Sequence, residues 1–210
     1  MRRLGITQRV EVIHDYGERR DCLDQRWSEL AFRLDFIPVP LPNITPDLAS
    51  VIALDLQLDA VLLSGGNTIS ALDPDAPNTA PERDRFEYAL IDAATDMSLP
   101  IVGVCRGMQV INKHLGGNLS RLDGHVSCRH TLQVDPAFSD MIVNDVNSYH
   151  NWGIAPGQLT EALCPIAVDN EGYTEAFTHK SKKISGIMWH PEREQPIRPT
   201  DIKLLKSLLT

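Results

Sequence analysis

The chain places a cysteine between two glycines, at a position where its residue type suits nucleophilic chemistry. Cys105 stands in PIVGVCRGMQVIN, with Gly103 and Gly107 two residues to either side. If the apolar run before Cys105 is a strand and the segment after it a helix, the thiol lies on a tight turn at the ligand-binding edge of a sheet. The glycines let backbone approach such a turn closely, and a helix N-terminus favours the thiolate. The pattern predicts a reactive thiol, although G-x-C-x-G is also typical of an ordinary turn holding a small buried cysteine.

A thiolate nucleophile needs a proton carrier, and the most suggestive histidine is His190 in GIMWHPERE. If the strand from residue 184 continues towards Glu192, its period of two puts His190 and Glu192 on one side, so that the carboxylate orients the imidazole. Cys105, His190 and Glu192 would then be the nucleophile, base and orienting group of a triad. H-P-E alone is equally typical of a strand-end turn with a solvated glutamate, so the prediction depends on both motifs together.

Acyl chemistry also requires donors for the negative oxygen that develops on the attacked carbonyl. The backbone amide of Arg106, directly after the cysteine, is one candidate. The segment Ser64-Gly65-Gly66 follows another strand-like run, and its glycine amides are further candidates. The same segment also fits a plain glycine-containing loop.

The elements that must position these residues follow from the periodicity of the chain. Apolar runs alternate with segments of helical spacing up to Gly116-Gly117, and the runs are continuous rather than alternating, which is typical of a parallel sheet covered on both faces. We expect one α/β domain over residues 1–210, doubly wound, with a mostly parallel sheet, short β additions after residue 117 and a closing helix from about Thr200. Expected strands lie at 4–6, 60–63, 101–104, 132–134, 166–168, 175–177 and 184–188, and expected helices near 23–34 and from 46, 81 and 108, with polar or turn-rich segments between.

Composition narrows the class of protein further. Of 210 residues, 23% are charged and the net charge is -8, which opposes a general nucleic-acid surface. No apolar stretch has the length of a signal peptide or a membrane span, so we expect a cytoplasmic protein without a membrane partner. The four cysteines lack C-x-x-C pairing and are expected to be thiols: Cys22, Cys105, Cys128 and Cys164.

With these motifs in place, the chain resembles the class I glutamine amidotransferase-like superfamily, whose Cys-His-Glu triad lies in G-x-C-x-G-x-Q and a late H-P-E. The similarity covers nearly the whole chain and includes LLSGG, PERDRFEYALIDAA, VGVCRGMQVIN, SCRHTLQV, VNSYHNWGI, TEAF and GIMWHPE. Arg106 and the R-D-x-x-E-x-x-L-I helix resemble the free-standing gamma-glutamyl hydrolases of this superfamily. Glutaminase subunits more usually carry an apolar residue after the cysteine.

The resemblance implies that Cys105 attacks a gamma-glutamyl carbonyl, that His190 protonates the leaving nitrogen, and that water resolves the thioester to release glutamate. Gln109 matches the family glutamine that contacts the glutamyl group. The segment Ser148, Tyr149 and His150 matches the one that holds the alpha-amino and carboxylate groups, although loop polarity alone also explains it. His130 matches a recurring family position, for which a structural role is equally open.

The spacing H-x-x-C-x-H at His125, Cys128 and His130 also offers three metal ligands. No clear fourth ligand accompanies them, and the resemblance explains this segment without zinc. We therefore expect neither a metal nor a cofactor.

The identity of the leaving group depends on the first forty residues, which look closer to the gamma-glutamyl-CDP-amidate hydrolases than to the gamma-glutamyl-gamma-aminobutyrate hydrolases. Arg9 and Arg19, together with Arg20 and Arg26, could bind the diphosphate of a cytidine nucleotide conjugate. Arginines on an acidic protein are also commonly just solvated.

Two other functional classes remain open from the sequence alone. A glutaminase subunit would deliver ammonia to a separate synthase, for which this chain has no room. A binding module could keep the fold without the activity, although the presence of Cys105, His190 and Glu192 argues against it. The sequence determines neither the oligomeric state nor the preferred nucleobase.

Overall fold

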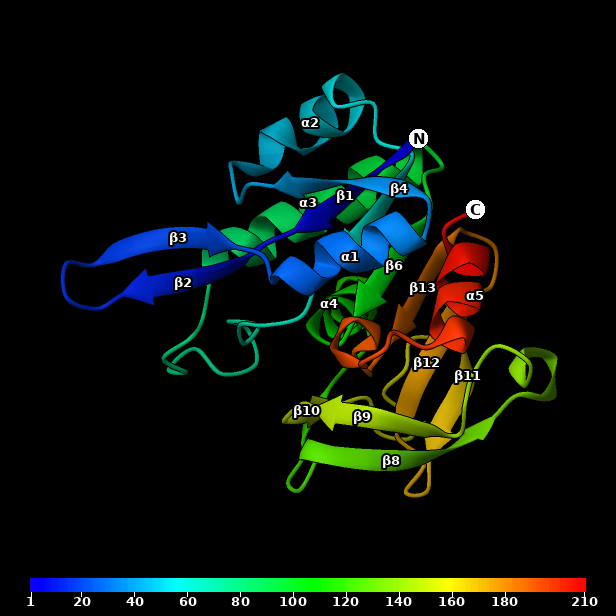
Figure 1. The fold of residues 1–210 in the computed structure, drawn as a ribbon. Coiled ribbons are helices and arrows are strands. Elements are labelled where there is room, and N and C mark those ends of the chain that lie inside the picture. The colour runs from blue at the N-terminus through cyan, green and yellow to red at the C-terminus, as the bar shows by residue number, and fades with distance from the viewer.

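The computed structural model describes residues 1–210, and a nine-stranded sheet runs through it (Figure 1). Five neighbouring strands are parallel and form one half of the sheet. In spatial order they are β4 (Phe36–Leu41), β1 (Arg2–Thr7), β5 (Ala60–Leu63), β6 (Ile101–Val104) and β13 (Ile184–Ile187). The α/β class and the parallel central sheet expected from the sequence are confirmed.

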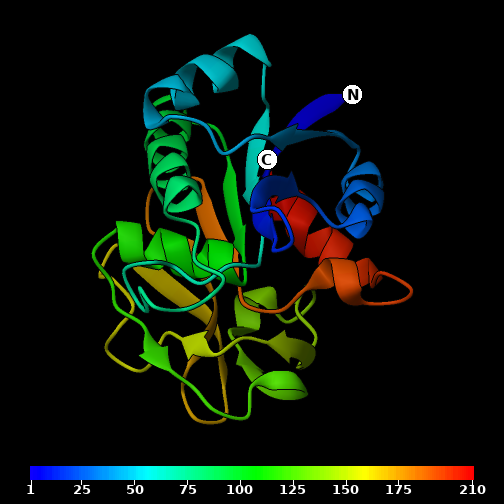
Figure 2. The same cartoon turned by 90° about the vertical axis from the view of Figure 1, so that its left-hand side faces the viewer.

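The strands at the centre of this half are buried on both faces because helices cover both. Every residue of β5 and β6 is buried, and successive residues contribute to opposite cores: Ala60 and Leu62 to one, Val61 and Leu63 to the other. Figure 2 shows the two helical layers on either side of the sheet. One layer holds α1 (Gln25–Arg33) and α5 (Pro199–Leu208), and the other holds α2 (Ala49–Asp55), α3 (Pro81–Asp96) and α4 (Arg106–His114).

The other half of the sheet is antiparallel and forms the lower part of Figure 1. It extends from β13 through four strands: β12 (Thr174–His179), β11 (Leu163–Asp169), β8 (Val126–Val134) and β9 (Asp145–Tyr149). The small pair of β7 (Ser120–Arg121) and β10 (Trp152–Gly153) lies beside it. The short β pieces expected after residue 117 are thus joined to the main sheet.

Two local expectations were wrong. The polar segment after the first strand is an antiparallel hairpin of β2 (Arg9–Ile13) and β3 (Glu18–Cys22), which projects from the domain (Figure 1). Its strands carry many charged residues, which masks the pattern, while Gly17 forms the turn at φ +71°. The strand from Ile184 also ends at Ile187 and does not reach Glu192, because Pro191 has no backbone N–H and begins a 3-10 turn, Pro191–Arg193.

None of the helices combines the length and the apolar character that a membrane-spanning helix requires.

Candidate active site

Cys105 lies on a strained turn between β6 and α4. Its backbone has φ 52° and ψ -106°, a region that residues with a side chain rarely adopt and that costs on the order of 1–3 kcal/mol. The flanking glycines are required by contact: a Cβ on Gly103 would lie 2.4 Å from the carbonyl carbon of Gly107, and one on Gly107 would lie 2.1 Å from the Leu63 oxygen. The predicted elbow is therefore present, with the helix beginning directly after the thiol.

The order of the strands brings three segments together around this turn. β6 lies between β5 and β13, and all three run parallel, so their carboxyl ends lie at one edge of the sheet. The end of β5 presents Ser64-Gly65-Gly66 on one side of Cys105. The end of β13 presents His190 on the other, and the Cys105 amide donates to the Ile187 carbonyl at 2.8 Å.

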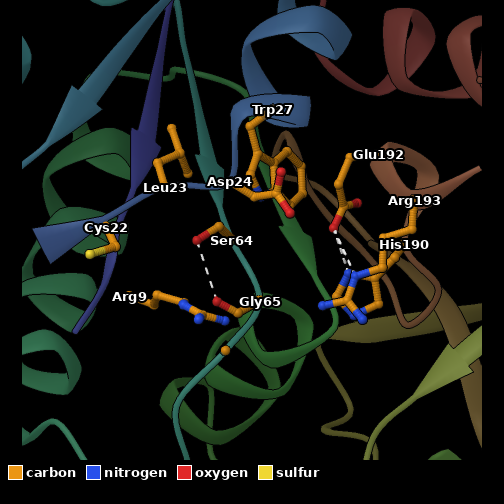
Figure 3. Close-up of a pocket in the computed structure, with 11 residues that line it drawn as sticks. Arg9, Cys22, Leu23, Asp24, Trp27, Ser64, Gly65, His190, Glu192 and Arg193 are labelled. Atoms are coloured by element: carbon orange, nitrogen blue, oxygen red, sulfur yellow. Dashed lines mark hydrogen bonds and ion pairs between the residues drawn. The ribbon is translucent and has the colours of Figure 1, made fainter. Parts of the chain in front are cut away.

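His190 and Glu192 are paired, as the H-P-E motif suggested. Nδ1 of His190 lies 2.7 Å from Oε1 of Glu192, and both side chains are buried. The 3-10 turn that begins at Pro191 folds Glu192 back onto the ring, so the pair arises from a turn rather than from strand alternation. Figure 3 shows this contact on one wall of a cavity. With Nδ1–H donating to the carboxylate, Nε2 remains for the thiol.

The backbone of His190 is held by Asn147 on β9, a residue that the sequence did not single out. The side-chain oxygen of Asn147 accepts from the His190 amide at 2.9 Å, and its Nδ2 donates to the His190 carbonyl at 2.9 Å. The same Nδ2 donates to Glu194 at 2.9 Å. This bidentate contact connects the antiparallel half of the sheet to the imidazole.

The thiol and the imidazole shift each other's pKa. Burial alone raises the pKa of Cys105, but the charge of His190 and the hydrogen bond between the two side chains outweigh it and lower the pKa. Burial opposes the charged form of His190, whereas Cys105 and then Glu192 favour it and raise the pKa of His190 to about 9. These shifts favour the thiolate and the imidazolium over the neutral pair, and the thiolate is the form that a cysteine nucleophile requires.

These shifts predict a pH profile. For a gamma-glutamyl amide such as glutamine, kcat/KM should stay high through neutral pH and fall as pH rises through about 9, because His190 then loses the proton that it must donate. The Glu192→Gln variant removes a carboxylate that raises the pKa of His190, so its alkaline limb should move to lower pH. Rate profiles from pH 5 to 10.5 test this, and an alkaline limb that does not move in the variant would contradict it.

The amides beside the thiol are suited to bind an oxyanion. Arg106 is the first residue of α4, where helix geometry leaves backbone N–H groups without an intrahelical partner. Gly65 packs against the imidazole so closely that a Cβ there would lie 2.8 Å from Cε1 of His190. Gly66 has φ +83°, which only glycine adopts readily.

A buried arginine, Arg83 on α3, fixes the orientation of this glycine segment. Its guanidinium donates to the carbonyls of Ser64, Gly65 and Gly66 at 2.7, 3.0 and 2.8 Å. Since a trans peptide is planar with C=O and N–H opposed, the amides of Gly65 and Gly66 must point away from Arg83. The arginine therefore sets the direction of the candidate oxyanion donors.

The side chain of Arg106 belongs to the same buried ion network. It donates to Glu87 and to Asp84, and Glu87 also accepts from Arg83 at 2.9 Å and from the Thr7 hydroxyl at 2.7 Å. Two arginines and two carboxylates thus balance in the core, where an unpaired charge would be costly. The R-D-x-x-E motif noted in the sequence supplies Arg83, Asp84 and Glu87 to this network, a role that the sequence did not predict.

Two cavities meet at the thiol and the imidazole. One, of about 680 Å³, is lined by Cys105, Gln109, Tyr149, His150 and the Asn67–Asn78 loop. The other, of about 230 Å³, is lined by His190 and Glu192 together with Arg9, Trp27 and Arg193 (Figure 3). Gly66 lies on the wall of both. We call them the large and the small cavity.

Three of the four predicted glutamyl contacts border the large cavity. Gln109 donates from Nε2 to the Trp152 carbonyl at 2.8 Å, which leaves its oxygen free. Tyr149 and His150 also line this cavity. Ser148 is buried, and its hydroxyl donates to the His125 carbonyl at 2.6 Å, so it faces away.

The large cavity also has charged residues on its wall that the sequence did not single out. Arg121 on β7 lies 3.7 Å from Asp73, and Asp75 is close by on the same loop. This wall therefore carries both signs of charge.

The arginines singled out in the sequence separate in space. Arg9 lines the small cavity and pairs with Glu11. Arg19 lines neither cavity and pairs with Glu82 at the start of α3, and Arg20 pairs with Glu18 within the hairpin. Arg26 borders a different surface hollow.

A cation that the sequence reasoning missed, Arg193, faces the small cavity instead. It follows Glu192 directly, and its guanidinium lies 4.4 Å from the centre of the Tyr149 ring. In the sequence, the signal for Arg193 is its position directly after Glu192 in H-P-E-R.

The two histidines of the H-x-x-C-x-H segment lie on the antiparallel half of the sheet and line neither cavity. They lie next to His150, which lines the large cavity. His125 and His130 come together there with two acidic residues, Asp169 and Glu175. Cys128 is not part of this group, which instead includes one carboxylate from β11 and one from β12.

Comparisons with known proteins place the chain among glutamine amidotransferase-like enzymes. The family model of Peptidase C26 matches residues 4–192. The gamma-glutamyl-CDP-amidate hydrolase of Campylobacter jejuni is 33% identical over 97% of this chain and 96% of its own. The gamma-glutamyl-gamma-aminobutyrate hydrolase of Escherichia coli O157:H7 is 24% identical over 84% of this chain and 80% of its own.

Solved structures share the fold at low sequence identity. A Thermoplasma acidophilum protein provisionally assigned to GMP synthase has a TM-score of 0.72 at 19% identity and covers 99% of this chain and 92% of its own. A glutamine amidotransferase from Thermotoga maritima has a TM-score of 0.66 at 16% identity, over 98% and 83%. The family match over residues 4–192 shows that the chain belongs to the Peptidase C26 family.

Proposed function

We propose that this protein hydrolyses a gamma-glutamyl amide through a thioester on Cys105. The observation that supports this most directly is the geometry of the site: a thiol on a strained turn, facing an imidazole whose other nitrogen lies 2.7 Å from a buried carboxylate. Membership of the Peptidase C26 family and the hydrolase relatives agree with it. Water is the second substrate.

The reaction uses two proton transfers at His190. The Cys105 thiolate attacks the side-chain carbonyl carbon of the glutamyl group, and the resulting oxyanion accepts from the amides of Arg106 and the Gly65-Gly66 segment. His190 donates its Nε2 proton to the leaving nitrogen, the C–N bond breaks, and a thioester remains. His190 then takes a proton from water, the hydroxide adds to the thioester carbonyl, and collapse releases glutamate and regenerates the thiolate. Glu192 holds Nδ1–H throughout.

The two cavities suggest where the two halves of the substrate bind. The glutamyl group fits the large cavity, where Gln109, Tyr149 and His150 surround the thiol and where Arg121 and Asp73 supply charges complementary to the alpha-carboxylate and alpha-amino groups. The leaving group then occupies the small cavity next to His190. We propose no direct contact for the Ser148 hydroxyl, since it is committed to His125.

We further propose that the leaving group carries a diphosphate, as in gamma-glutamyl-CDP-amidate. Arg9 and Arg193 both border the small cavity, and guanidinium groups bind phosphate oxygens in bidentate pairs. The exposed Arg9–Glu11 pair is weak enough to open for such a ligand. The relative that is 33% identical over nearly the full length bears the name of this activity.

The arginines give a matched test of the leaving group. The Arg9→Ala variant should lose about 10- to 100-fold in kcat/KM for gamma-glutamyl-CDP-amidate, the value of one charge-assisted contact, but less than about 3-fold for glutamine. The Arg19→Ala variant is the control, because Arg19 is bound to Glu82 outside both cavities. Equal losses of Arg9→Ala on both substrates, or an effect of Arg19→Ala as large as that of Arg9→Ala, would contradict the diphosphate proposal.

The activity itself is tested by comparing kcat/KM for gamma-glutamyl-CDP-amidate, gamma-glutamyl-gamma-aminobutyrate and glutamine with the purified chain, since discrimination is read from that ratio. A preference for the nucleotide would support the diphosphate proposal. A preference for aminobutyrate would keep the hydrolase and replace the leaving group. Release of glutamate from none of them without a second protein would instead indicate a glutaminase subunit.

A further inference from the structure

Three imidazoles and two carboxylates meet on the antiparallel half of the sheet, on the far side of His150 from the large cavity. The ligand atoms of His125, His130, Asp169 and Glu175 all lie within 4.8 Å of one another, and His125 and His130 also form such a group with His150. These residues come from the turn before β8, from β8 itself, from the end of β11 and from β12. His125 and His130 are near neighbours in the sequence, as are Asp169 and Glu175, and the sheet brings the two pairs together.

Four polar atoms of this group lack the hydrogen bonds that burial demands. Nδ1 of His125, Nε2 of His150 and both carboxylate oxygens of Glu175 are buried without a hydrogen-bond partner. Glu175 is only 1% exposed, and its Oε1 lies 3.5 Å from Nε2 of His150. A carboxylate taken out of water without partners is costly. The arrangement therefore calls for a cation among these atoms.

The group is held by rigid neighbours rather than by chance contacts. One oxygen of Asp169 accepts from the amides of Glu171 and Tyr173, both at 2.9 Å, which turns the other towards His130 at 3.9 Å. Pairing of β8 with β11 and of β11 with β12 fixes the spacing between His130, Asp169 and Glu175.

An opening of about 340 Å³ leads from the surface to this group, with His125, Cys128, His130 and Asp169 on its wall. The basic residue on that wall, Arg129, is bound to Asp145 and Glu194 at 2.7 and 3.2 Å and does not compete for the acidic oxygens. A hydrated ion can therefore reach the ligand atoms.

We propose that His125, His130, Asp169 and Glu175 bind a first-row divalent cation, with Zn²⁺ the best match. Two imidazoles and two carboxylates form a four-coordinate set that Zn²⁺ accepts. Tetrahedral ligands at about 2.1 Å lie roughly 3.4 Å apart, so atoms that are up to 4.8 Å apart must close by at most about 1.4 Å. The ion would tie β8 to β11 and β12 and stabilise the wall that carries Tyr149 and His150. Its role is structural, and it takes no part in the hydrolysis.

The test measures the metal and not the activity. Protein without a histidine tag is stripped with a chelator, titrated with Zn²⁺ by calorimetry, and assayed for bound metal by mass spectrometry after desalting. We expect one Zn²⁺ per chain, a dissociation constant below about 1 µM and a Tm that rises on binding. His125→Gln and Asp169→Asn should each lose the bound ion, whereas His114→Gln, a histidine on α4 paired with Asp92, should retain it.

Two results would overturn the proposal. The first is no bound metal and no rise in Tm with Zn²⁺, Co²⁺ or Mn²⁺ for a chain that is folded by circular dichroism, which would leave Glu175 paired with a protonated His150 instead. The second concerns Cys128, whose sulfur lies 3.6 Å from Nε2 of His130. A thiolate-to-Co²⁺ band that disappears in Cys128→Ser would refute this ligand set.

Discussion

Replacement of Cys105 with glycine or with alanine is expected to abolish hydrolysis of gamma-glutamyl amides, with kcat lower by at least about 10⁴-fold, because neither residue can form the thioester. We expect the glycine variant to be more stable than the alanine variant, which is the reverse of the order found within a helix. In an ordinary helical position alanine is the more stable residue by about 1 kcal/mol, but φ 52° at this position strains any Cβ. The glycine variant should therefore be the more stable, by about 1 kcal/mol.

Urea unfolding of both variants and steady-state glutamate release measure these two effects separately. Cys164→Ala on β11 is the matched control, since Cys164 lies away from both cavities, and it should keep full activity. An alanine variant that is more stable than the glycine variant would show that the elbow is not strained. Hydrolysis that survives either replacement would refute Cys105 as the nucleophile.

Replacement of Arg83 with lysine is the second change with a large expected effect. Burial and then Arg106 lower the pKa of Arg83 to about 10, so the side chain is still charged at neutral pH. Lysine keeps the charge but cannot donate to three carbonyls and Glu87 at once, because it lacks the planar fork. The Gly65-Gly66 amides should then lose their fixed direction, and kcat should fall by about 10²- to 10³-fold, the usual value of oxyanion donors.

The role of Arg83 is positioning, so its test needs a readout that a general loss of stability would not move. KM for glutamine should change little while kcat falls, and the fall should persist well below the Tm of the variant. Arg85→Lys, on the exposed side of the same helix, is the control. Parallel losses in kcat and KM, or a kcat for Arg83→Lys equal to that of the parent, would argue against control of the oxyanion donors by Arg83.

Local sequence predicted the elements with strong, short-range signals. The strands at Ala60–Leu63 and Ile101–Val104 lie at the predicted residues because short, continuous apolar runs next to turn-forming residues allow little else. The hairpin of β2 and β3 was missed because β3, ERRDC, is almost entirely charged, and the valines that alternate with charged residues in β2 are too few to mark a hairpin by themselves. Charged exposed strands form through turn geometry and pairing, which a periodicity argument does not capture.

In the candidate site too, the features that depend on neighbouring residues were predicted, and those that depend on tertiary contacts were not. The sequence by itself determined that Cys105 lies on a strand-to-helix turn and that Glu192 follows His190 at a spacing that allows contact, because both depend on residues that are neighbours in the chain. It could not show that Arg9 borders the small cavity while Arg19 turns to Glu82, since side-chain direction on a hairpin depends on what the hairpin contacts. Arg193 was missed for the same reason.

Only the tertiary structure decided what surrounds these motifs. The placement of β6 between β5 and β13 brings residues 65, 105 and 190 to one edge, and the order of strands in a sheet is set by packing rather than by any local pattern. Arg83 contacts the glycine segment and Asn147 contacts His190 across long separations in the chain. The same physical reason explains the group of His125, Asp169 and Glu175: single polar residues carry no signal until burial and strand register place their unpaired atoms against one another.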